Sequence, residues 1–370
     1  MTDVDPALAT RLAGIVNLAG FEPLARAAMD PAAFDYVAGG AWDELTLADN
    51  EAAWRCRRLR PRVLVDVFRV DTATTMLGAP VAMPVALAPM AVLSLADPGA
   101  ESAMARAAAA AGVPMILSTS ASESIETVAQ AVPEGVHWFQ FYVQSDMGVS
   151  RSLVERAEAA GFSAIILTVD LPVLGYRQRD RLSDFVLPPL GNFSGVSATH
   201  GSRRLKALAN PVDQQATTMT WADLARIRGW SSLPLVLKGI LTVEDARLAV
   251  DHGVDAIVVS NHGARQLDRV AATADVLPEI VHAVDGRTEV WVDGGIRRGL
   301  DIALALGLGA RGVLLGRPAY WALAAGGTAG VERALAILRE EFALTLALLG
   351  TRTPADITPA HVATANSAER

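Results

Sequence analysis

The sequence predicts an α/β protein whose strands close into a (β/α)8 TIM barrel, because strand-like and helix-like segments alternate along most of the chain. Short apolar runs of four to seven residues, typical of buried parallel strands, recur from residue 85 onward. These predicted strands are Val85–Met90, Met115–Ser118, Val136–Tyr142, Ala164–Asp170, Pro234–Lys238, Ala256–Asn261, Glu289–Asp293 and Gly312–Gly316.

Helix-like segments lie between these runs, among them Glu101–Ala111, Val149–Ala160, Val243–His252 and Leu300–Leu306. A glycine follows each of them closely, and glycine readily adopts the left-handed conformation that ends a helix and turns the chain back. These glycines are Gly112, Gly161, Gly253 and Gly309. An open dinucleotide-binding sheet would need a Gly-x-Gly-x-x-Gly turn after an early strand, and none is present there. The pattern therefore favours the closed barrel.

Three segments lie outside this alternation. Residues 1–60 show helical segments without strand alternation, which predicts a helical N-terminal extension. Residues 171–219 are rich in Pro, Gly, Ser and Asn and predict a long, lid-like loop after the fourth strand. Thr328–Leu349 is predicted to be a long amphipathic closing helix, followed by a peripheral tail after Pro354.

Composition excludes several classes of protein. With 51% hydrophobic and 19% charged residues in 370, the chain is globular rather than disordered. A net charge of −8 argues against nucleic acid as the main partner. Asp3 and Asp5 replace the basic start of a signal peptide, and no apolar run approaches the ~20 residues of a membrane span. The single Cys56 fits a reducing compartment, so we expect a soluble, cytoplasmic protein.

Polar side chains follow nearly every predicted strand. In barrel enzymes the chemistry lies at the carboxyl ends of the strands, so these residues predict one shared site. They are Ser118, Gln140, Tyr142, Thr168, Asp170, Arg177, Lys238, Ser260, His262, Arg265, Asp293, Arg297 and Arg317. No metal site is predicted, because the six histidines lack His-x-His or His-Glu-x-x-His spacing.

Two groups of these residues indicate specific chemistry. His262 can accept a proton near neutral pH, Arg265 three residues later can hold a carboxylate, and Asp170 can orient the imidazole. On the last two strands, Gly294-Gly295 precedes Arg297 and Gly316 precedes Arg317. Exposed backbone N–H groups beside guanidinium groups form a phosphate cradle, in the place where barrels commonly have one.

The residues alone leave Lys238 and Tyr36 open. Lys238 closes an apolar strand, so it is either a lysine reaching for solvent, a fixed positive charge beside a developing anion, or a Schiff-base lysine. Tyr36, near the end of a short helix before Gly39-Gly40, is interpreted from its position as a packing residue.

Several motifs together resemble one family. SNHGARQLD, VDGGIRRGLD, LGRP, LTVD and FQFY are similar to the FMN-dependent α-hydroxy acid oxidases and dehydrogenases, over roughly residues 20 to 355. The resemblance implies that residues 1–370 form a single FMN-binding barrel domain. It also implies a 2-hydroxy acid substrate, O2 or another electron acceptor, and a homotetramer or homo-octamer.

The resemblance also assigns roles to residues of this chain. It implies that His262 is the active-site base with Asp170 as its partner, and that Arg177, Arg265 and Tyr36 bind the substrate carboxylate. Tyr142 would lie near the substrate hydroxyl, and Lys238 near the flavin N1–C2 carbonyl. The implied FMN contacts are Pro89, Met90, Ala91, Ser118, Gln140, Thr168, Lys238, Ser260, Asp293, Gly294, Gly295, Arg297, Gly316 and Arg317.

Two positions refine the expected substrate and acceptor. Glycolate-oxidase-like members carry Trp where this chain has Ser120, so we expect room for a bulky or aromatic substrate such as mandelate or hydroxymandelate. Ala91 matches the alanine of the oxidases, where some members that react poorly with oxygen carry Gly, and so favours an oxidase that produces H2O2.

Other functions stay open on the sequence. Within the family they are a dehydrogenase with a quinone or other acceptor, a short-chain lactate or glycolate oxidase, and an oxidase of a larger biosynthetic α-hydroxy or α-amino substrate. Outside it they are a phosphate-binding isomerase or aldolase that uses Lys238 as its Schiff-base lysine, and a non-catalytic flavoprotein. The residues decide neither the stereochemistry of the substrate nor whether its electrons leave as hydride or through a carbanion.

Overall fold

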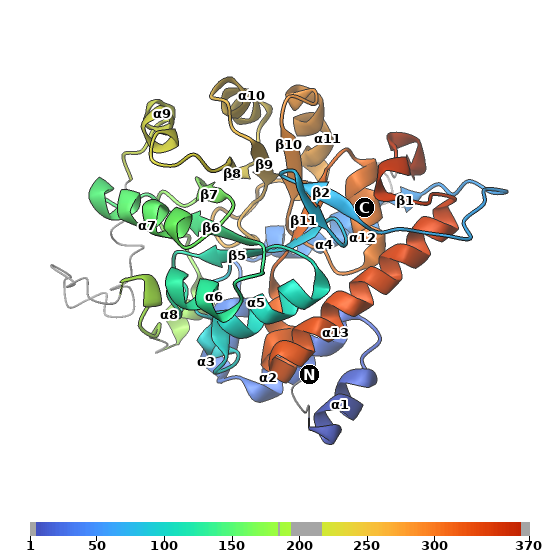
Figure 1. The fold of residues 1–370 in the computed structure, drawn as a ribbon, viewed down its shortest axis with the longest axis horizontal. Helices are drawn as coiled ribbons and strands as arrows, with labels where there is room; N and C mark the ends of the chain where they lie inside the picture. Colours follow the sequence, from blue (N-terminus) through green and yellow to red (C-terminus); the bar gives the residue numbers. More distant parts are fainter. Residues whose placement is uncertain (1–4, 184–185, 194–216, 364–370) are drawn as a thin grey trace.

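A computed structural model describes residues 5–183, 186–193 and 217–363 of the chain. Eight parallel strands close into a barrel in the order β10-β11-β4-β5-β6-β7-β8-β9 (Figure 1). The strands are β4 (Val85–Leu87), β5 (Met115–Ser118), β6 (His137–Phe141), β7 (Ile165–Thr168), β8 (Leu235–Ile240), β9 (Ala256–Val259), β10 (Glu289–Val292) and β11 (Gly312–Leu315). The predicted (β/α)8 barrel is confirmed.

Each predicted strand coincides with an observed one, and the differences lie mostly at the carboxyl ends. The predicted Val85–Met90 ends at Leu87 in β4, and the predicted Ala256–Asn261 ends at Val259 in β9. The polar residues there leave the hydrogen-bonded ladder and turn towards the site. Strand β8 differs in the other direction and continues past Lys238 to Ile240 through an irregularity at Gly239.

Helices surround the barrel (Figure 1). They are α5 (Ala100–Ala111), α6 (Ile125–Ala131), α7 (Met147–Ala159), α9 (Leu224–Arg228), α10 (Val243–Asp251), α11 (Thr273–Val284), α12 (Gly299–Gly307) and α13 (Arg317–Leu349). The predicted glycine turns are confirmed, since Gly112, Gly161, Gly253 and Gly309 have φ of 66°, 87°, 69° and 99°. The backbone of α13 leaves helical geometry at Gly326 and Gly327, so the predicted closing helix is its second part.

The N-terminal segment is mainly helical, as predicted. It contains α1 (Pro6–Ala13), η1 (Leu18–Gly20), α2 (Phe21–Ala28), α3 (Pro31–Ala38) and α4 (Leu45–Arg55), and α2 packs against α13. The prediction of no strand in this segment is wrong, because β1 (Arg58–Leu59) pairs with β12 (Val362–Ala363). A two-residue strand is too short to show an alternating pattern. This pairing ties the tail after Pro354, which also contains η6 (Pro354–Asp356) and η7 (Pro359–His361), to the body of the protein (Figure 1).

A β-hairpin that the sequence analysis missed precedes the barrel. Strands β2 (Thr74–Met76) and β3 (Ala79–Val81) are joined by Leu77 and Gly78, whose φ of 47° and 73° is typical of a tight two-residue hairpin. Met76 and Val81 pack into the cluster inside the barrel. The backbone N–H of Leu77 donates to Glu289 at the start of β10, so the hairpin covers the amino ends of the strands.

The connection after β7 is partly described. Its described residues include α8 (Gln178–Leu182) and η3 (Gly191–Phe193), and it leads to η5 (Trp221–Asp223), which begins with a capping box formed by Thr220 and Asp223. Residues 184–185 and 194–216 of the predicted lid-like loop lie outside the described residues, so the prediction for them stays untested. The remaining short element, η2 (Leu93–Leu95), follows β4.

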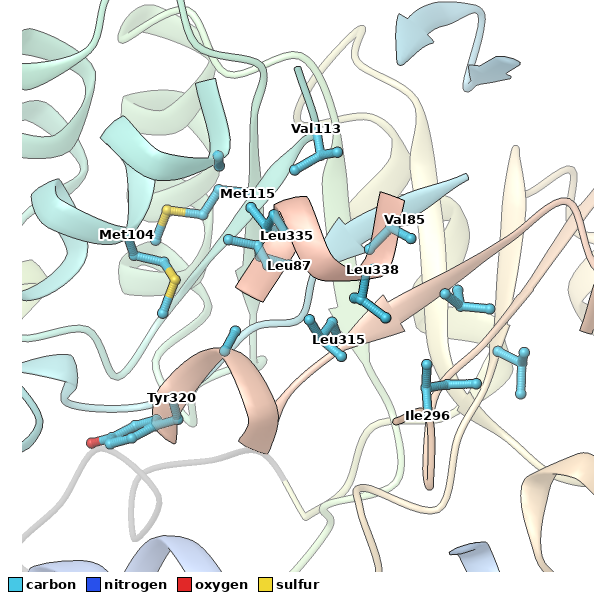
Figure 2. Close-up of a cluster of buried hydrophobic side chains, with 14 of the residues drawn as sticks. Val85, Leu87, Met104, Val113, Met115, Ile296, Leu315, Tyr320, Leu335 and Leu338 are labelled. Carbon is cyan, nitrogen blue, oxygen red and sulfur yellow. The ribbon is translucent and has the colours of Figure 1, made fainter. Parts of the chain in front are cut away.

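Two apolar layers hold the barrel together. Strand residues that face outward, such as Val85, Leu87 and Leu315, pack against Leu335 and Leu338 of α13 (Figure 2). Inward-facing residues form a second cluster, in which Trp138 and Trp291 stack with ring centroids 5.0 Å apart. The other members of the inner cluster on the barrel strands are Ala86, Ala88, Ile116, Ala164, Ile166, Val236, Ala256, Val258 and Leu314. The mixture of large and small side chains fills the barrel interior.

Two features are absent from the described residues 5–183, 186–193 and 217–363. No helix there is both long enough and apolar enough to cross a membrane. No group of three or more His, Cys, Asp and Glu side chains there is arranged to hold a metal ion.

Candidate active site

A cavity of about 610 Å³ opens at the carboxyl ends of the barrel strands. The residues predicted for the site that line it are Tyr36, Pro89, Met90, Ala91, Ser118, Tyr142, Thr168, Arg177, Lys238, His262, Arg265, Asp293, Gly294, Gly295, Arg297, Gly316 and Arg317. Three predicted residues do not line the cavity themselves but hydrogen-bond to residues that do. Asp170 bonds to His262, Gln140 to Ser118 and Ser260 to Lys238. The structure thus brings all the predicted site residues together.

The barrel geometry explains why these residues meet. In a strand every second side chain faces the same way. On each of these strands, a site residue stands two positions after the last apolar residue that faces inward. Ser118 follows Ile116 in this way, and Lys238 follows Val236. The same step leads from Trp138 to Gln140, from Ile166 to Thr168, from Val258 to Ser260, from Trp291 to Asp293 and from Leu314 to Gly316. The floor of the cavity is therefore the next interior layer above the apolar cluster.

His262 is held in an uncommon backbone conformation. His262, Gly263 and Ala264 have φ of 59°, 63° and 61°, in the left-handed region that non-glycine residues rarely adopt. The hydroxyl of Ser260 accepts the His262 backbone N–H at 3.1 Å, and the side chain of Asn261 accepts that of Ala264 at 3.1 Å. This tight turn directs the imidazole into the cavity. Backbone strain of this kind persists where the surrounding structure enforces it, often at functional sites.

The imidazole pairs with a carboxylate from another strand. Nδ1 of His262 lies 2.8 Å from Oδ1 of Asp170, which follows β7, whereas His262 follows β9. Strand β8 lies between them, and its Gly239 leaves the space, since a Cβ there would lie 2.5 Å from Cγ of Asp170. On its other side, Nε2 of His262 lies 3.5 Å from the hydroxyl of Tyr142.

The environment sets the protonation of these groups. Burial lowers the pKa of His262 below its ordinary value, although Asp170 acts in the opposite direction. Burial would raise the pKa of Asp170, but the interaction with His262 outweighs it, and the pKa of Asp170 is lowered. Burial and the charge of Asp170 raise the pKa of the Tyr142 hydroxyl. The cavity at neutral pH therefore contains a neutral imidazole held by a carboxylate, beside a protonated phenol.

Two arginines lie on the wall of the cavity. Nε of Arg177 donates to the carbonyl of Arg265 at 3.2 Å, and its Nη2 donates to Oε1 of Gln266 at 3.3 Å. Burial and the neighbouring Arg265 lower the pKa of Arg177 to about 10, so it stays charged at neutral pH. Gln266 also donates to the carbonyls of Asp170 and Val173. Sequence reasoning left Gln266 unassigned, although it stands inside the motif around His262.

The C-terminal end of α3 orients Arg265 and a third arginine, Arg317. Nη1 of Arg265 donates to the carbonyls of Tyr36 and Gly39 at 2.6 and 2.8 Å, and its guanidinium lies 5.0 Å from the centre of the Tyr36 ring. Arg317 donates to the carbonyls of Val37, Gly39 and Gly263 at 2.9 to 3.0 Å. Free carbonyls at a helix C-terminus attract cations. The N-terminal extension thus contributes backbone carbonyls to the site besides Tyr36, and the sequence analysis did not predict these carbonyl contacts.

Lys238 lies between two partners on neighbouring strands. Its Nζ donates to the Ser260 hydroxyl at 2.9 Å and lies 3.2 Å from Oδ2 of Asp293. Burial acts to lower the pKa of Lys238, but the carboxylates of Asp293 and Asp170 raise it above the ordinary value. A Schiff-base lysine reacts as the neutral amine. Lys238 therefore suits a fixed positive charge better than covalent catalysis.

The donor groups around the cavity fit FMN. Within the described part of the chain, the side chains of Gln140, Thr168 and Asp293 each have a buried polar atom without a hydrogen-bond partner: Nε2, Oγ1 and Oδ1. Buried polar atoms are normally paired, so these atoms indicate a polar ligand. An amide and a hydroxyl suit the polar edge of a flavin ring, and Lys238 suits negative charge on it.

A second region of the cavity suits the phosphate of FMN. Gly294 and Gly295 have φ of 91° and 80°, and a Cβ on Gly295 would overlap the carbonyl of Asn50 in α4. Arg317 lines the same cavity, and burial lowers its pKa to about 9, which still leaves it charged. Arg297 also lines the cavity, but its Nη2 pairs with Glu51 at 2.8 Å. An incoming phosphate would share Arg297 with that carboxylate.

Comparison with known proteins gives consistent matches. The sequence pattern of the FMN-dependent dehydrogenase family matches residues 25–364. An L-lactate oxidase of Nostoc sp. is 47% identical, over 94% of this chain and 98% of that protein. A glycolate oxidase of Spinacia oleracea is 46% identical, over 94% and 96%. A crystal structure of mandelate oxidase with (S)-4-hydroxymandelic acid has a TM-score of 0.87 at 43% identity, covering 92% of this chain and 97% of that one.

The cation beside the glycine turn provides a test of FMN binding. Arg317→Ala removes a buried charge, and we expect the dissociation constant of FMN to rise at least about tenfold, because charged hydrogen bonds contribute about 1.5–3 kcal/mol each. Quenching of flavin fluorescence on titration into the apoprotein measures this constant.

The matched control is Arg311→Ala, at the opposite end of the same strand, where the exposed side chain bonds to Thr75. Equal FMN affinity of the Arg317→Ala and Arg311→Ala proteins would contradict the assignment of the phosphate end.

Proposed function

Because the chain belongs to the FMN-dependent dehydrogenase family, we propose that it is an FMN-dependent (S)-2-hydroxy acid oxidase, which converts a 2-hydroxy acid to the 2-oxo acid. FMN is its cofactor and supplies an acceptor for two electrons. The observation that carries the proposal is one cavity lined by a carboxylate-paired histidine, His262, and by two arginines, Arg177 and Arg265.

The reaction needs a base and a clamp. His262 is poised to take a proton from the α-carbon or its hydroxyl, and Asp170 stabilises the imidazolium that forms. Arg177 and Arg265, with Tyr36, bind the substrate carboxylate and fix its orientation. Tyr142, whose hydroxyl faces Nε2 of His262, contacts the substrate hydroxyl.

The remaining lining residues bind the cofactor in this proposal. The ammonium of Lys238 would hold the flavin ring and would favour negative charge on it. Gln140 and Thr168 supply the unpartnered polar atoms that meet the ring. The glycine turn after β10 and Arg317 would hold the phosphate. The other proposed contacts are Pro89, Met90, Ala91, Ser118, Ser260, Asp293, Gly294, Gly295, Arg297 and Gly316.

We propose a bulky or aromatic substrate, such as mandelate or hydroxymandelate. Ser120 lines the cavity, and its small side chain leaves space on that wall. Solved structures of mandelate oxidase, one of them with (S)-mandelic acid, resemble this chain. The lactate and glycolate oxidases among its relatives keep a short-chain 2-hydroxy acid as the alternative.

Molecular oxygen is the proposed acceptor, with H2O2 as the product. Ala91 lines the cavity, and the named relatives are oxidases. The alternative is a dehydrogenase that passes electrons to a quinone or another acceptor. The isomerase or aldolase interpretation loses support, because the chain matches a flavin family and Lys238 has a raised pKa. A non-catalytic flavoprotein would not need the pair His262 and Asp170.

We further propose that the chain forms one domain and self-associates into a tetramer or octamer in the cytoplasm. The loop before the β2–β3 hairpin exposes apolar side chains, with Leu64 and Phe68 103% and 89% exposed. Apolar patches of this kind often mark protein interfaces. Light scattering of the purified protein measures its subunit number.

An anaerobic absorbance titration tests the proposed function. We expect the yellow, FMN-loaded protein to bleach with (S)-mandelate, more readily than with glycolate or L-lactate, and to recover rapidly when air is admitted. Bleaching with slow recovery would indicate another acceptor. If none of the 2-hydroxy acids bleaches the flavin, the proposed reaction is wrong.

The pair of His262 and Asp170 predicts a pH profile. Because the pKa of His262 is lowered, the neutral base is present at pH 7, and kcat/KM should rise with pH below about 6.5 and then level off. Asp170→Asn removes the influence that raises the pKa of His262, so the midpoint should move to lower pH. The plateau should fall about 10²-fold, because the imidazolium loses its partner.

The control for this experiment is Asp285→Asn, at an exposed position with φ of 52° that asparagine also tolerates. A midpoint that moves to higher pH in Asp170→Asn, or an unchanged plateau, would contradict the role of Asp170. His262→Ala should retain FMN and lose flavin reduction by substrate.

The cavity wall at Ser120 predicts a change of substrate preference. Ser120→Trp adds an indole to the wall, so kcat/KM for mandelate should fall more than tenfold relative to glycolate, by a loss of about 1.4 kcal/mol or more. Ser120→Ala, which keeps the space, is the control. An unchanged ratio of the two substrates would refute the aromatic pocket.

A further inference from the structure

One part of the long connection after β7 is built into the wall of the cavity. Leu187 lines the cavity, and five residues later Asn192 is only 3% exposed. Both lie in the segment 186–193, which packs against the loop between β5 and α6.

The side chain of Asn192 bonds to three backbone groups of the β5–α6 loop. Its Nδ2 donates to the carbonyls of Ser118 and Thr119 at 3.2 and 3.1 Å. Its Oδ1 accepts the N–H of Ile125, the first residue of α6, at 3.0 Å. Asparagine is suited to this position, because it carries both a donor pair and an acceptor on one short side chain.

Neighbouring contacts fix the segment more closely. The N–H of Gly191 donates to the carbonyl of Ala121 at 2.9 Å, and a Cβ on Gly191 would lie 2.6 Å from the carbonyl of Ser122. The carbonyl of Asn192 accepts Nη1 of Arg156 at 3.0 Å, and Arg156 is itself held by two bonds to Glu126 on α6. The backbone of the segment therefore lies so close to the β5–α6 loop that a side chain at position 191 would collide with it.

The other end of this contact is the active site. The Thr119 hydroxyl donates to the carbonyl of Gln140 at 2.8 Å and accepts the N–H of Tyr142 at 3.3 Å. Ser118 donates to the side chain of Gln140 at 3.2 Å and accepts the N–H of Ser120 at 3.1 Å. Asn192 thus holds the two residues that align the ends of β5 and β6.

We propose that Asn192 is a positioning residue and Leu187 a specificity-determining residue. Asn192 fixes Ser118 and Thr119, and through them Gln140 on the cofactor side and Tyr142 on the substrate side. By the same contacts it anchors the segment 186–193, so that Leu187 forms a wall of the substrate cavity. The part that concerns substrate choice rests on the proposed function, whereas the part that concerns FMN does not.

Asn192→Asp tests the positioning role at nearly constant volume. The carboxylate can still accept the N–H of Ile125, but its other oxygen faces two carbonyl oxygens instead of donating to them. We expect the dissociation constant of FMN to rise about tenfold, because the loss of both donated bonds displaces Gln140 and so removes about one hydrogen bond to the cofactor. Fluorescence titration of the apoprotein measures it. The control is Asn17→Asp, where the side-chain oxygen accepts the N–H of Gly20 and aspartate keeps that bond.

Leu187→Ala tests the wall without changing a hydrogen bond. The ratio of kcat/KM for (S)-mandelate to that for L-lactate should change at least about fivefold, mainly through KM, because the methyl groups that line the cavity and contact the substrate are lost. The affinity for FMN should stay the same as in the wild type. Asn192→Asp should alter the same ratio, since it releases Leu187.

The outcomes separate the two proposals. An Asn192→Asp protein that loses thermal stability but keeps the wild-type FMN affinity and substrate ratio would reduce Asn192 to a structural residue. If the ratio of kcat/KM for (S)-mandelate to that for L-lactate is unchanged in Leu187→Ala, Leu187 does not determine specificity. This result holds even if Asn192→Asp fails to fold. If no 2-hydroxy acid reduces the wild-type flavin, the proposed function fails, while the FMN titrations still decide the role of Asn192.

Discussion

Closure of eight parallel strands into a barrel is the constraint on which the rest of this structure depends. It directs every second side chain of each strand inward, so the interior is built in layers. The lower layer is apolar and centred on the stacked Trp138 and Trp291. The next layer, at the carboxyl ends of the strands, consists of residues such as Ser118, Thr168 and Lys238. These side chains face the cavity. The floor of the cavity is therefore a continuation of the core.

The same geometry gathers positive charge in a protein whose net charge is −8. Arg177, Arg265 and Arg317 converge with Lys238 on one cavity, and burial lowers the pKa of Arg177 and Arg317. The carbonyls at the C-terminal end of α3 offset part of the repulsion, because they accept hydrogen bonds from two of these arginines. Anionic ligands such as a phosphate or a carboxylate complete the balance of charge. The helical extension is thus an electrostatic part of the site as well as a packing element.

The pairing of His262 with Asp170 shows how the site depends on residues without side chains. The two follow strands that are not neighbours, and only the glycine on the strand between them leaves room for the carboxylate. Gly191 has a comparable role at the cavity wall, where any side chain would collide with the β5–α6 loop. In both places the close approach of backbone and side chain, rather than the chemistry of the glycine, makes the arrangement possible.

The sequence by itself determined the barrel, because eight buried strands must be apolar on both faces and each helix needs a turn that glycine favours. It also predicted which residues gather at one end, since parallel strands deliver their carboxyl ends to the same rim. It did not reveal the β2–β3 hairpin or the β1–β12 pair, because strands of two or three residues are too short for a periodic pattern. Nor did it reveal Gln266, Asn192 or the carbonyls of α3, whose contacts join segments far apart in the chain. Such contacts depend on tertiary packing, which places each donor opposite its acceptor. The type of a residue does not indicate which distant group it will face.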